Sequence, residues 1–560
     1  MEFLKTKGRC IVDEKGKEVL LKGYGIGNWM VQEGFLFGSS EFSTDLKPFM
    51  RAGEMDRGRS IDQILVELCG KEYAESFWKR YYRNYFSEKD IQYLAELGFN
   101  SVRLPLSARA FRKECPGVEY DEETFRILDE IIGWCEQYGL YVILDMHAAA
   151  GGQSGIPCDD GVDNIPHLFT DEESWERTVL LWEDLARRYA DQAAVAGYEL
   201  LNEPLALQRW DRYIPDLIRF YEETIKRIRR WDKKHIFFLQ GHRLASRTDI
   251  FDRVYDPEYH NWVMTMHLYE VLPDLGVLGP ILATSEKLDV PVWMGETGGN
   301  EAYMTVLYEM LYENHIGVNV WCQKGEEHAD AATLCTYSLP DGFEKIRSYA
   351  QEGGAKPGYE SSMQIFDRLL EQIRFENCTF HPEFADAILR RRDVTVPAVG
   401  YDMLPGYGNS FYGTYPYCVF CGYRREDRMH IVYEPDFVPY ESPQYAFAAC
   451  RRTPKYGDWT HLELVMDKQE FACYTIRQIR QDTKVYLVCR TGESCSIRVT
   501  VRGETKILYL KPSAELQVIP AAVIEKGEDT SVKVECEDGR LILRSVIFSE
   551  KSDKMQRIIV

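Results

Sequence analysis

The 560-residue sequence contains no apolar run of the roughly 18–20 residues that span a bilayer. Positive charge is also scarce, because 67 Lys and Arg face 89 Asp and Glu, which gives a net charge of −22. Non-specific nucleic-acid binding and binding to anionic membrane surfaces both depend on clustered Lys and Arg. The sequence therefore indicates neither a nucleic-acid partner nor a membrane partner.

The first ten residues, MEFLKTKGRC, lack the apolar stretch of a secretory signal, so the sequence predicts a cytoplasmic protein. Its 15 cysteines are an odd number, scattered along a chain that is too large to need disulfide staples. We expect them to be reduced thiols. With 45% hydrophobic and 13% aromatic residues, the chain is also too apolar to be disordered.

What the sequence does contain, up to about residue 395, is a series of short apolar runs that alternate with long amphipathic segments. Continuous apolar runs are typical of parallel strands that are buried on both faces. The eight runs span residues 19–29, 99–106, 141–147, 195–204, 235–241, 262–269, 290–298 and 317–324. Strand and helix in eightfold alternation predict an α/β fold, the (β/α)8 TIM barrel.

Two further regions flank this pattern. Residues 10–21 predict a β-hairpin that turns at residues 14–16, so we assign residues 1–394 to a catalytic barrel domain with an N-terminal hairpin. Residues 395–560 hold closely spaced strand-like runs with turn residues between them, which predict a C-terminal antiparallel β-sandwich domain. Residues 30–59 have few periodic apolar positions and are expected to form a long loop.

Polar or aromatic residues lie near the ends of most of the eight runs. The active site of such a barrel lies at the carboxyl ends of its strands, so these side chains should meet at one rim. They are Arg103, His147, Asn202, Glu203, His267, Tyr269, Glu296 and Trp321. The carboxylates Glu203 and Glu296 come from opposite sides of the barrel and could flank a bond held between them. Glycoside hydrolysis uses two such carboxyl groups, one protonated and one ionised.

The segments VRLP, DMHAAAGGQSG, LNEP, MHLY, MGETG and VWCQK, in this order, resemble glycoside hydrolase family 5. Members of that family are retaining β-glycosidases on (β/α)8 barrels. The resemblance covers about residues 10–390 and includes all eight positions named above. It implies that Glu203 is the acid/base and that Glu296 is the nucleophile, with no cofactor and no metal.

The same resemblance implies a role for each of the other six residues. Three of them would hold the catalytic carboxylates: Arg103 and Tyr269 would orient Glu296, and His267 would lie near Glu203. The other three would contact the sugar. Asn202 would donate to the 2-OH, His147 would lie near the 3-OH, and Trp321 would form the platform under the sugar ring.

The first run, GYGIGNWMVQEGF, resembles the matching segment of the family's exo-β-1,3-glucanases, in which a Glu binds hydroxyls of the terminal sugar. Glu33 is the corresponding residue, although Gly34 stands where those enzymes have Pro. The loop after the third run also departs from that group, because Ala148 and Ala150 replace Gly and Pro. The resemblance therefore adds Glu33 as a substrate-binding residue.

Alternatives remain for individual residues. His147 and His267 could be buried core residues, or could bind zinc together with the two Glu, since zinc takes three or four N, S or O ligands. Metal-like spacing also occurs in two other pairs, Cys378 with His381 and Cys418 with Cys421.

The sequence thus predicts a retaining, exo-acting β-glycosidase of the β-glucosidase type. Its partner would be a small carbohydrate, either a β-glucoside or a β-gluco-oligosaccharide. An endo-β-glucanase or β-mannanase is the alternative among enzymes. A sugar-binding protein on a barrel scaffold is the alternative outside enzymes.

Overall fold

The computed structural model describes residues 1–34, 55–115, 117, 119–269, 273, 275–327, 333–416, 423–424, 426–435, 437 and 456–550. Most of the predicted long loop, residues 35–54, lies outside this set, and so do Cys418 and Cys421. The chain divides into two compact units, a barrel unit of Met1–Tyr269, Ile281–Gly298 and His315–His381 and a sandwich unit of Glu270–Pro280, Gly299–Asn314 and Pro382–Val560. The boundary between residues 394 and 395 stays a prediction.

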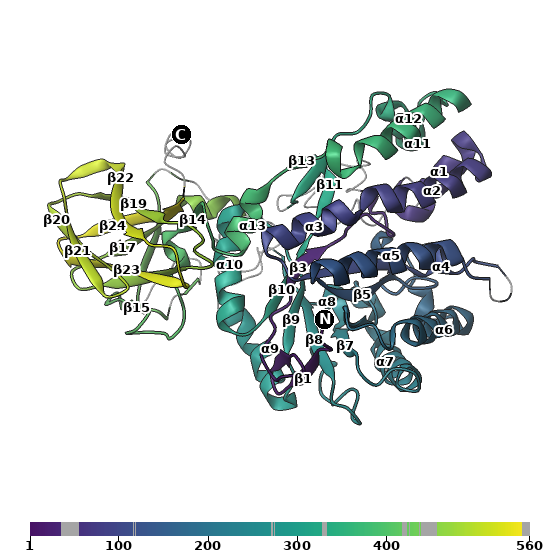
Figure 1. Cartoon of the computed structure of the whole chain (residues 1–560), viewed down its shortest axis with the longest axis horizontal. Coiled ribbons are helices and arrows are strands. Elements are labelled where there is room, and N and C mark those ends of the chain that lie inside the picture. The colour runs from purple at the N-terminus through teal and green to yellow at the C-terminus, as the bar shows by residue number, and fades with distance from the viewer. Residues whose placement is uncertain are drawn as a thin grey trace. The chain divides into compact units, whose positions relative to one another are not determined.

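Eight parallel strands close into a barrel in the order β10-β3-β4-β5-β6-β7-β8-β9 (Figure 1). The strands are β3 (Lys22–Gly25), β4 (Ser101–Ser107), β5 (Tyr141–Ala148), β6 (Val195–Glu199), β7 (Ile236–Gln240), β8 (Trp262–His267), β9 (Val292–Glu296) and β10 (Gly317–Trp321). Each overlaps one of the eight predicted runs, which confirms the predicted barrel. The apolar residues are continuous because these strands are buried on both faces.

Helices separate the strands along the chain. They are α1 (Gly58–Cys69), α2 (Lys71–Tyr85), α3 (Glu88–Leu97), α4 (Ala108–Phe111), α5 (Glu122–Tyr138), α6 (Glu172–Tyr189), α7 (Ile214–Ile228), α8 (His242–Ala245), α9 (Leu275–Leu288), α10 (Glu301–Glu313), α11 (Phe343–Glu352), α12 (Tyr359–Gln372) and α13 (Pro382–Ile388). Local sequence sets several of their ends. Helix α3 begins with a capping box between Ser87 and Asp90 and ends at Gly98, whose φ of 92° suits glycine.

The amino terminus forms a small antiparallel sheet of β1 (Lys5–Lys7) and β2 (Cys10–Val12). Beyond β2 the chain turns back at residues 13–17, where the Gly16 N–H donates to the Asp13 carbonyl at 3.0 Å. Val12 and Glu18 then form an antiparallel bridge. The predicted turn is therefore present, while strand β1 was not predicted. A second small sheet in the same unit joins β11 (Lys324–Glu326), β12 (Cys335–Tyr337) and β13 (Thr379–Phe380).

The sandwich unit contains two antiparallel sheets. The first has the strand order β16-β17-β24-β19-β22, with β14 also paired to β24. Its strands are β14 (Val394–Pro397), β16 (His430–Tyr433), β17 (Leu462–Met466), β19 (Thr483–Thr491), β22 (Ser513–Ile524) and β24 (Leu541–Ser549). The second, in the order β15-β18-β23-β20-β21, comprises β15 (Phe411–Tyr412), β18 (Phe471–Ile476), β20 (Cys495–Val501), β21 (Glu504–Leu510) and β23 (Thr530–Asp538). These sheets form the predicted β-sandwich.

Strand β20 shows why the sequence predicts strands in this region. Its buried residues alternate with half-buried ones, because successive side chains of a strand point to opposite faces of the sheet. The described part of the chain contains 12 cysteines, and none of them is in a disulfide. No helix among the described residues has the length and apolar character needed to cross a membrane.

Candidate active site

The centre of the site is Arg103, which projects from β4 and is fully buried. Its guanidinium donates to Glu199 at 2.5 Å, to Glu296 at 2.6 Å and to the Asn202 side-chain oxygen at 2.8 Å, and it lies 3.1 Å from the Asp145 carboxylate. Burial opposes the charged form, but the three carboxylates outweigh it and raise the pKa of Arg103 above its ordinary value. Arg103 therefore places a permanent positive charge among three carboxylates.

Glu296, the last residue of β9, is held through both of its oxygens. Oε1 accepts from Arg103, and Oε2 accepts from the Tyr269 hydroxyl at 3.0 Å. The His267 Nδ1 atom lies 3.5 Å from the same Oε2. The Glu296 carboxylate is therefore fixed in orientation next to a positive charge.

Glu203 follows strand β6 and has a φ of 44°, in the left-handed region that non-glycine residues seldom adopt. Its N–H donates to the Gln240 side-chain oxygen at 2.6 Å, and its Oε1 accepts from His267 Nδ1 at 2.9 Å. Burial raises the pKa of the Glu203 carboxyl above its ordinary value, against the smaller effects of His147 and Arg103. The environment therefore favours the protonated form of Glu203.

Glu203 and Glu296 face each other across a short gap. One ligand atom from each of Glu203, His267 and Glu296 lies within 4.8 Å of the others. We call these three residues the catalytic-site cluster. Carboxyl groups about 5–5.5 Å apart are typical of retaining glycosidases, whereas about 6.5–9.5 Å is typical of inverting ones.

Gln240, at the end of β7, sets the proton positions around His267. Its side-chain oxygen accepts from Glu203, so its Nε2 must donate, and it does so to Glu199 at 2.5 Å and toward His267 Nε2 at 3.0 Å. His267 Nε2 is then the acceptor, and the ring proton resides on Nδ1, facing Glu203. Burial lowers the pKa of His267 to about 4, so the ring is neutral near pH 7.

A second hydrogen-bonded chain orients His147. Because the Asn202 oxygen accepts from Arg103, its Nδ2 is the atom that donates toward His147 Nε2 at 3.3 Å. The Nδ1 of His147 then donates to Asp145 at 2.8 Å. The ring stacks on Trp321 with a centroid distance of 5.1 Å and an interplanar angle of 3°. Burial lowers the pKa of His147 to about 4 and raises that of Asp145 to about 7.

Glu33 also lies in this site, and only 8% of its surface is exposed. Its carboxyl group hydrogen-bonds to the Trp321 side chain and interacts electrostatically with Glu296 and Glu203. Burial and then these two carboxylates raise the pKa of Glu33 well above its ordinary value. Its Oε2 is buried without a hydrogen-bond partner among the residues that the structure describes. The structure thus brings all nine predicted residues together.

Sequence reasoning missed several members of the network. Asp145 lies inside strand β5, Glu199 is the last residue of β6, and Gln240 is the last residue of β7. In the loop after β5, Gln153 donates to the carbonyls of His147 and Asn202, both at 2.8 Å. The polar end of the fifth predicted run could have revealed Gln240, since the other strand ends were found in the same way.

Possible metal ligands converge in three places among the described residues. Besides the catalytic-site cluster, they are Cys10, Glu18 and His315, here called the floor cluster, and Glu309, Glu313 and Asp402, here called the sandwich-unit cluster. The suggested pair of Cys378 and His381 belongs to none of them, and its members hydrogen-bond to Arg374 and Thr336 instead.

Comparison with known proteins agrees with this geometry. Residues 65–327 match the family described as cellulase (glycosyl hydrolase family 5). The barrel belongs to glycosyl hydrolase family 5. The resemblance identified from the sequence segments is thereby confirmed.

Relatives in this family carry several names. A β-xylosidase of Phanerodontia chrysosporium is 32% identical over 273 residues, or 48% of this chain and 52% of that protein. A glucan 1,3-β-glucosidase of Candida oleophila is 28% identical, over 52% of this chain and 66% of that protein. Endoglucanase C of Acetivibrio thermocellus is 30% identical, over 31% and 48%. The chain spans about half to two thirds of the length of these relatives.

Proposed function

We propose that this family 5 protein is a retaining, exo-acting β-glycosidase that hydrolyses small β-glucosides or β-gluco-oligosaccharides by double displacement. The observation that carries this proposal is the short separation of Glu203 and Glu296, since one carboxyl oxygen of each lies within 4.8 Å of one of the other. So short a gap suits direct attack by one carboxylate, because an inverting enzyme needs about 6.5–9.5 Å to place a water molecule between the groups.

In the first step, Glu296 attacks the anomeric carbon while the bond to the leaving oxygen breaks. Arg103 and Tyr269 support this role because they hold both carboxylate oxygens. Glu203 gives its proton to the leaving oxygen, for which its raised pKa prepares it. The neutral His267 donates to one Glu203 oxygen and orients the carboxyl group.

In the second step, Glu203 is ionised and takes a proton from water, whose oxygen attacks the anomeric carbon. The ester bond to Glu296 breaks, and the product keeps the β configuration because two inversions have occurred. Asn202 and His147 are held on the network of Arg103 and Asp145, and we assign them contacts with the sugar hydroxyls. Trp321 would lie under the ring of the sugar.

Exo action is supported by Glu33. Its carboxyl group hydrogen-bonds to the Trp321 side chain and is close enough to Glu296 and Glu203 for their charges to raise its pKa, and its Oε2 is buried without a hydrogen-bond partner among the described residues. A buried polar atom without a hydrogen bond costs about 1–3 kcal/mol, which a hydroxyl of a terminal sugar would relieve. An endo-acting β-glucanase is the second candidate, favoured by the similarity to endoglucanase C.

The test is hydrolysis of 4-nitrophenyl β-glucoside, β-xyloside, β-mannoside and β-galactoside, followed by defined β-gluco-oligosaccharides. We expect turnover of the glucoside, release of single glucose units from oligosaccharides, and β-glucose as the first product in NMR spectra. The β-xyloside is included because of the β-xylosidase relative. A ladder of oligosaccharide products would favour the endo alternative.

Two results would refute the proposal. An α-configured first product would exclude retention. Binding of sugars without turnover of any glycoside would indicate the sugar-binding protein instead. The Glu296→Gln variant, purified in parallel, serves as the control for contaminating glycosidases.

A further inference from the structure

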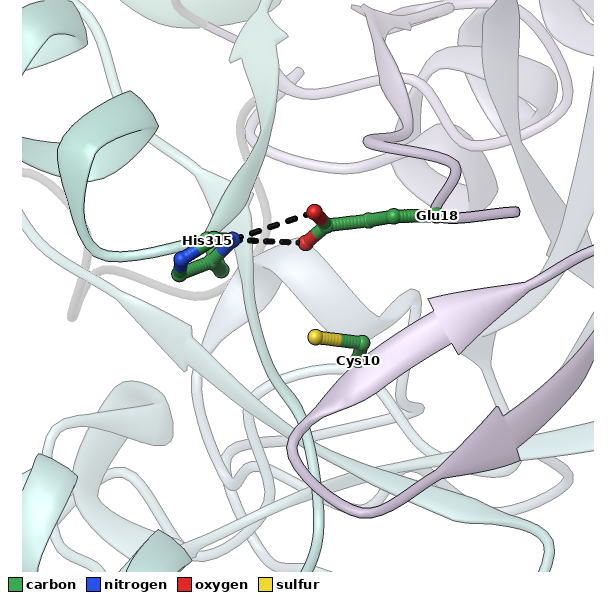
Figure 2. Close-up of side chains that lie close together, drawn as sticks. All are labelled: Cys10, Glu18 and His315. Atoms are coloured by element: carbon green, nitrogen blue, oxygen red, sulfur yellow. Dashed lines mark hydrogen bonds and ion pairs between the residues drawn. The ribbon is translucent and has the colours of Figure 1, made fainter. Parts of the chain in front are cut away.

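The floor cluster lies at the end of the barrel opposite the catalytic residues. Glu18 precedes strand β3 and His315 precedes strand β10, whereas the catalytic residues follow or end their strands. Figure 2 shows the Cys10, Glu18 and His315 side chains converging from three segments of the chain. This group takes no part in the proposed hydrolysis.

The fold itself brings these three residues together. Val12 and Glu18 form an antiparallel bridge, so Cys10, two residues before Val12, is on the same face as Glu18 and diagonal to it. Strand β10 pairs in parallel with β3, with Val318 opposite Lys22. This pairing places the chain before β10, including His315, beside the chain before β3, including Glu18.

Their contacts already join the three side chains. His315 Nδ1 lies 2.8 Å and 3.1 Å from the two oxygens of Glu18 (Figure 2). Cys10 hydrogen-bonds to the same carboxylate, and burial, followed by the charge of Glu18 and this hydrogen bond, raises the pKa of its thiol. One ligand atom from each residue lies within 4.8 Å of the others. A thiol, an imidazole and a carboxylate therefore converge on one small space.

This donor set is chemically selective. Thiolate and imidazole ligands suit zinc and other borderline divalent transition metals, whereas calcium and magnesium prefer oxygen ligands. The site is also open to solvent, because the His315 side chain is 61% exposed and that of Glu18 is 34% exposed. The net charge of −22 raises the local concentration of cations around the protein.

We propose that Cys10, Glu18 and His315 form a zinc site on the floor of the barrel, with water as the fourth ligand. Binding would release the Cys10 thiol proton to solvent and replace both hydrogen bonds to Glu18. Zinc bonds of about 2.0–2.3 Å in a tetrahedron place ligand atoms roughly 3.3–3.7 Å apart. The Glu18 and His315 atoms need to separate by about half an ångström, which solvent-exposed side chains can do.

Cobalt(II) is the probe, because a thiolate bound to it gives a sulfur-to-metal charge-transfer band in the near ultraviolet. We would strip the purified full chain with a chelator, remove the chelator and titrate with Co²⁺. The expected result is this band, saturating at one equivalent and lost when Zn²⁺ displaces Co²⁺. The melting temperature should rise with added Zn²⁺.

Variants identify the ligands. Cys10→Ala should abolish the band, and His315→Ala should weaken Co²⁺ binding at least about tenfold. Cys115→Ala is the matched control, because that half-buried thiol also lies near a carboxylate, Glu119 at 3.7 Å, and should leave the band unchanged. The absence of a band in the wild type, its survival in Cys10→Ala, or Co²⁺ binding without sulfur character would each overturn the proposal.

Discussion

The barrel unit and the sandwich unit each contain a crowded group of buried acidic residues beside arginine, yet the two groups differ in what surrounds them. In the sandwich-unit cluster, Asp402 accepts from Arg390 at 3.1 Å and from the N–H and hydroxyl of Thr475 at 3.1 Å and 2.7 Å. Glu309 pairs with Arg477, and Glu313 accepts two backbone N–H groups. Each of these carboxyl groups accepts at least one hydrogen bond from the protein, and Glu309 Oε2, which accepts none from a described residue, lies 3.6 Å from the Arg390 guanidinium.

Each cluster contains one half-buried carboxyl group, Glu203 in the barrel unit and Glu313 in the sandwich unit. The Glu203 side chain is 15% exposed, compared with 4% for Glu309 and for Asp402. Carboxylate crowding and neighbouring arginine are thus common to both units, and do not by themselves mark a catalytic group. What distinguishes the barrel site is the set of donors around this half-buried group. Both oxygens of Glu313 accept backbone N–H groups, whereas only Oε1 of Glu203 accepts a hydrogen bond from a described residue, which leaves its Oε2 for a substrate.

The largest expected difference between the two groups is in catalysis. Glu296→Ala should lower kcat/KM on the order of 10⁴-fold or more, because the covalent step requires this carboxylate. Glu309→Gln, the matched change in the sandwich-unit cluster, should leave kcat/KM within about threefold of the wild type. Aryl glycoside kinetics measure both.

Azide separates loss of the nucleophile from loss of the fold. It should restore part of the turnover in Glu296→Ala and give the α-configured glycosyl azide, because only one displacement then occurs. Wild-type rates in Glu296→Ala, or a similar loss in Glu309→Gln, would remove the functional contrast between the two clusters.

The next expected effect is a loss of folding stability, which should be about equal in the two units. Arg103→Met and Arg390→Met should each destabilise the protein by about 3–5 kcal/mol, because each leaves buried carboxylates without their positive partner. Urea unfolding measures the loss. The control, Arg126→Met, removes an exposed pair with Glu123 and should change stability by less than about 0.5 kcal/mol. An Arg103 variant as stable as this control would contradict the electrostatic role of Arg103.

Glu203→Ala should show a dependence on the leaving group that no sandwich-unit variant shares. Substrates with poor leaving groups should lose about 10²–10⁴-fold in kcat/KM, since their oxygen needs a proton in the first step. A 2,4-dinitrophenyl glycoside should lose far less, because its leaving group departs unprotonated. Equal losses on both substrates would argue against Glu203 as the acid.

The smallest expected effect is on the pH dependence of stability. Burial, with the charge of Glu309, raises the pKa of Glu313 to about 8. The folded state thus binds this proton more tightly than the unfolded state, so the stabilisation is complete below about pH 4.5 and is lost as pH rises through 8. We expect unfolding free energy to fall on the order of 2 kcal/mol over this window, and Glu313→Gln to remove that fall. Urea unfolding at intervals from pH 4.5 to 8.5 measures it, and a stability that rises with pH would contradict the assignment.

The sequence predicted the barrel because buried parallel strands produce continuous apolar runs. It also predicted most of the residues at the catalytic rim, because each run ends where the chain leaves the sheet. Glu296 and Arg103 were found in this way. Gln240 was missed although it ends its run in the same way, and its role becomes visible only from its contacts with Glu203 and His267 beside the neighbouring strands β6 and β8. Asp145 was missed for a related reason, because a polar residue inside an apolar run says nothing about which partner it meets.

The sandwich-unit cluster could not be predicted from the pattern at all. Glu309 and Glu313 lie on helix α10, where carboxylates four residues apart usually face solvent. Asp402 comes from a loop about 90 residues later in the sequence. Only the tertiary fold shows that these side chains meet, and only the donors around them show that they serve to hold the structure together.

The pairing of β3 with β10 has a consequence for synthesis of the chain. Lys22 meets Val318, a partner made almost 300 residues later. At about 5–20 residues per second, the ribosome needs roughly 15–60 s to produce that partner. Until then the outer edge of β3 has no neighbouring strand, so the nascent barrel is an open sheet with an edge available for wrong pairings. The first barrel strand to be made is therefore among the last to have both of its neighbours, and delays in translation before residue 317 should lengthen the period in which the chain is prone to aggregate.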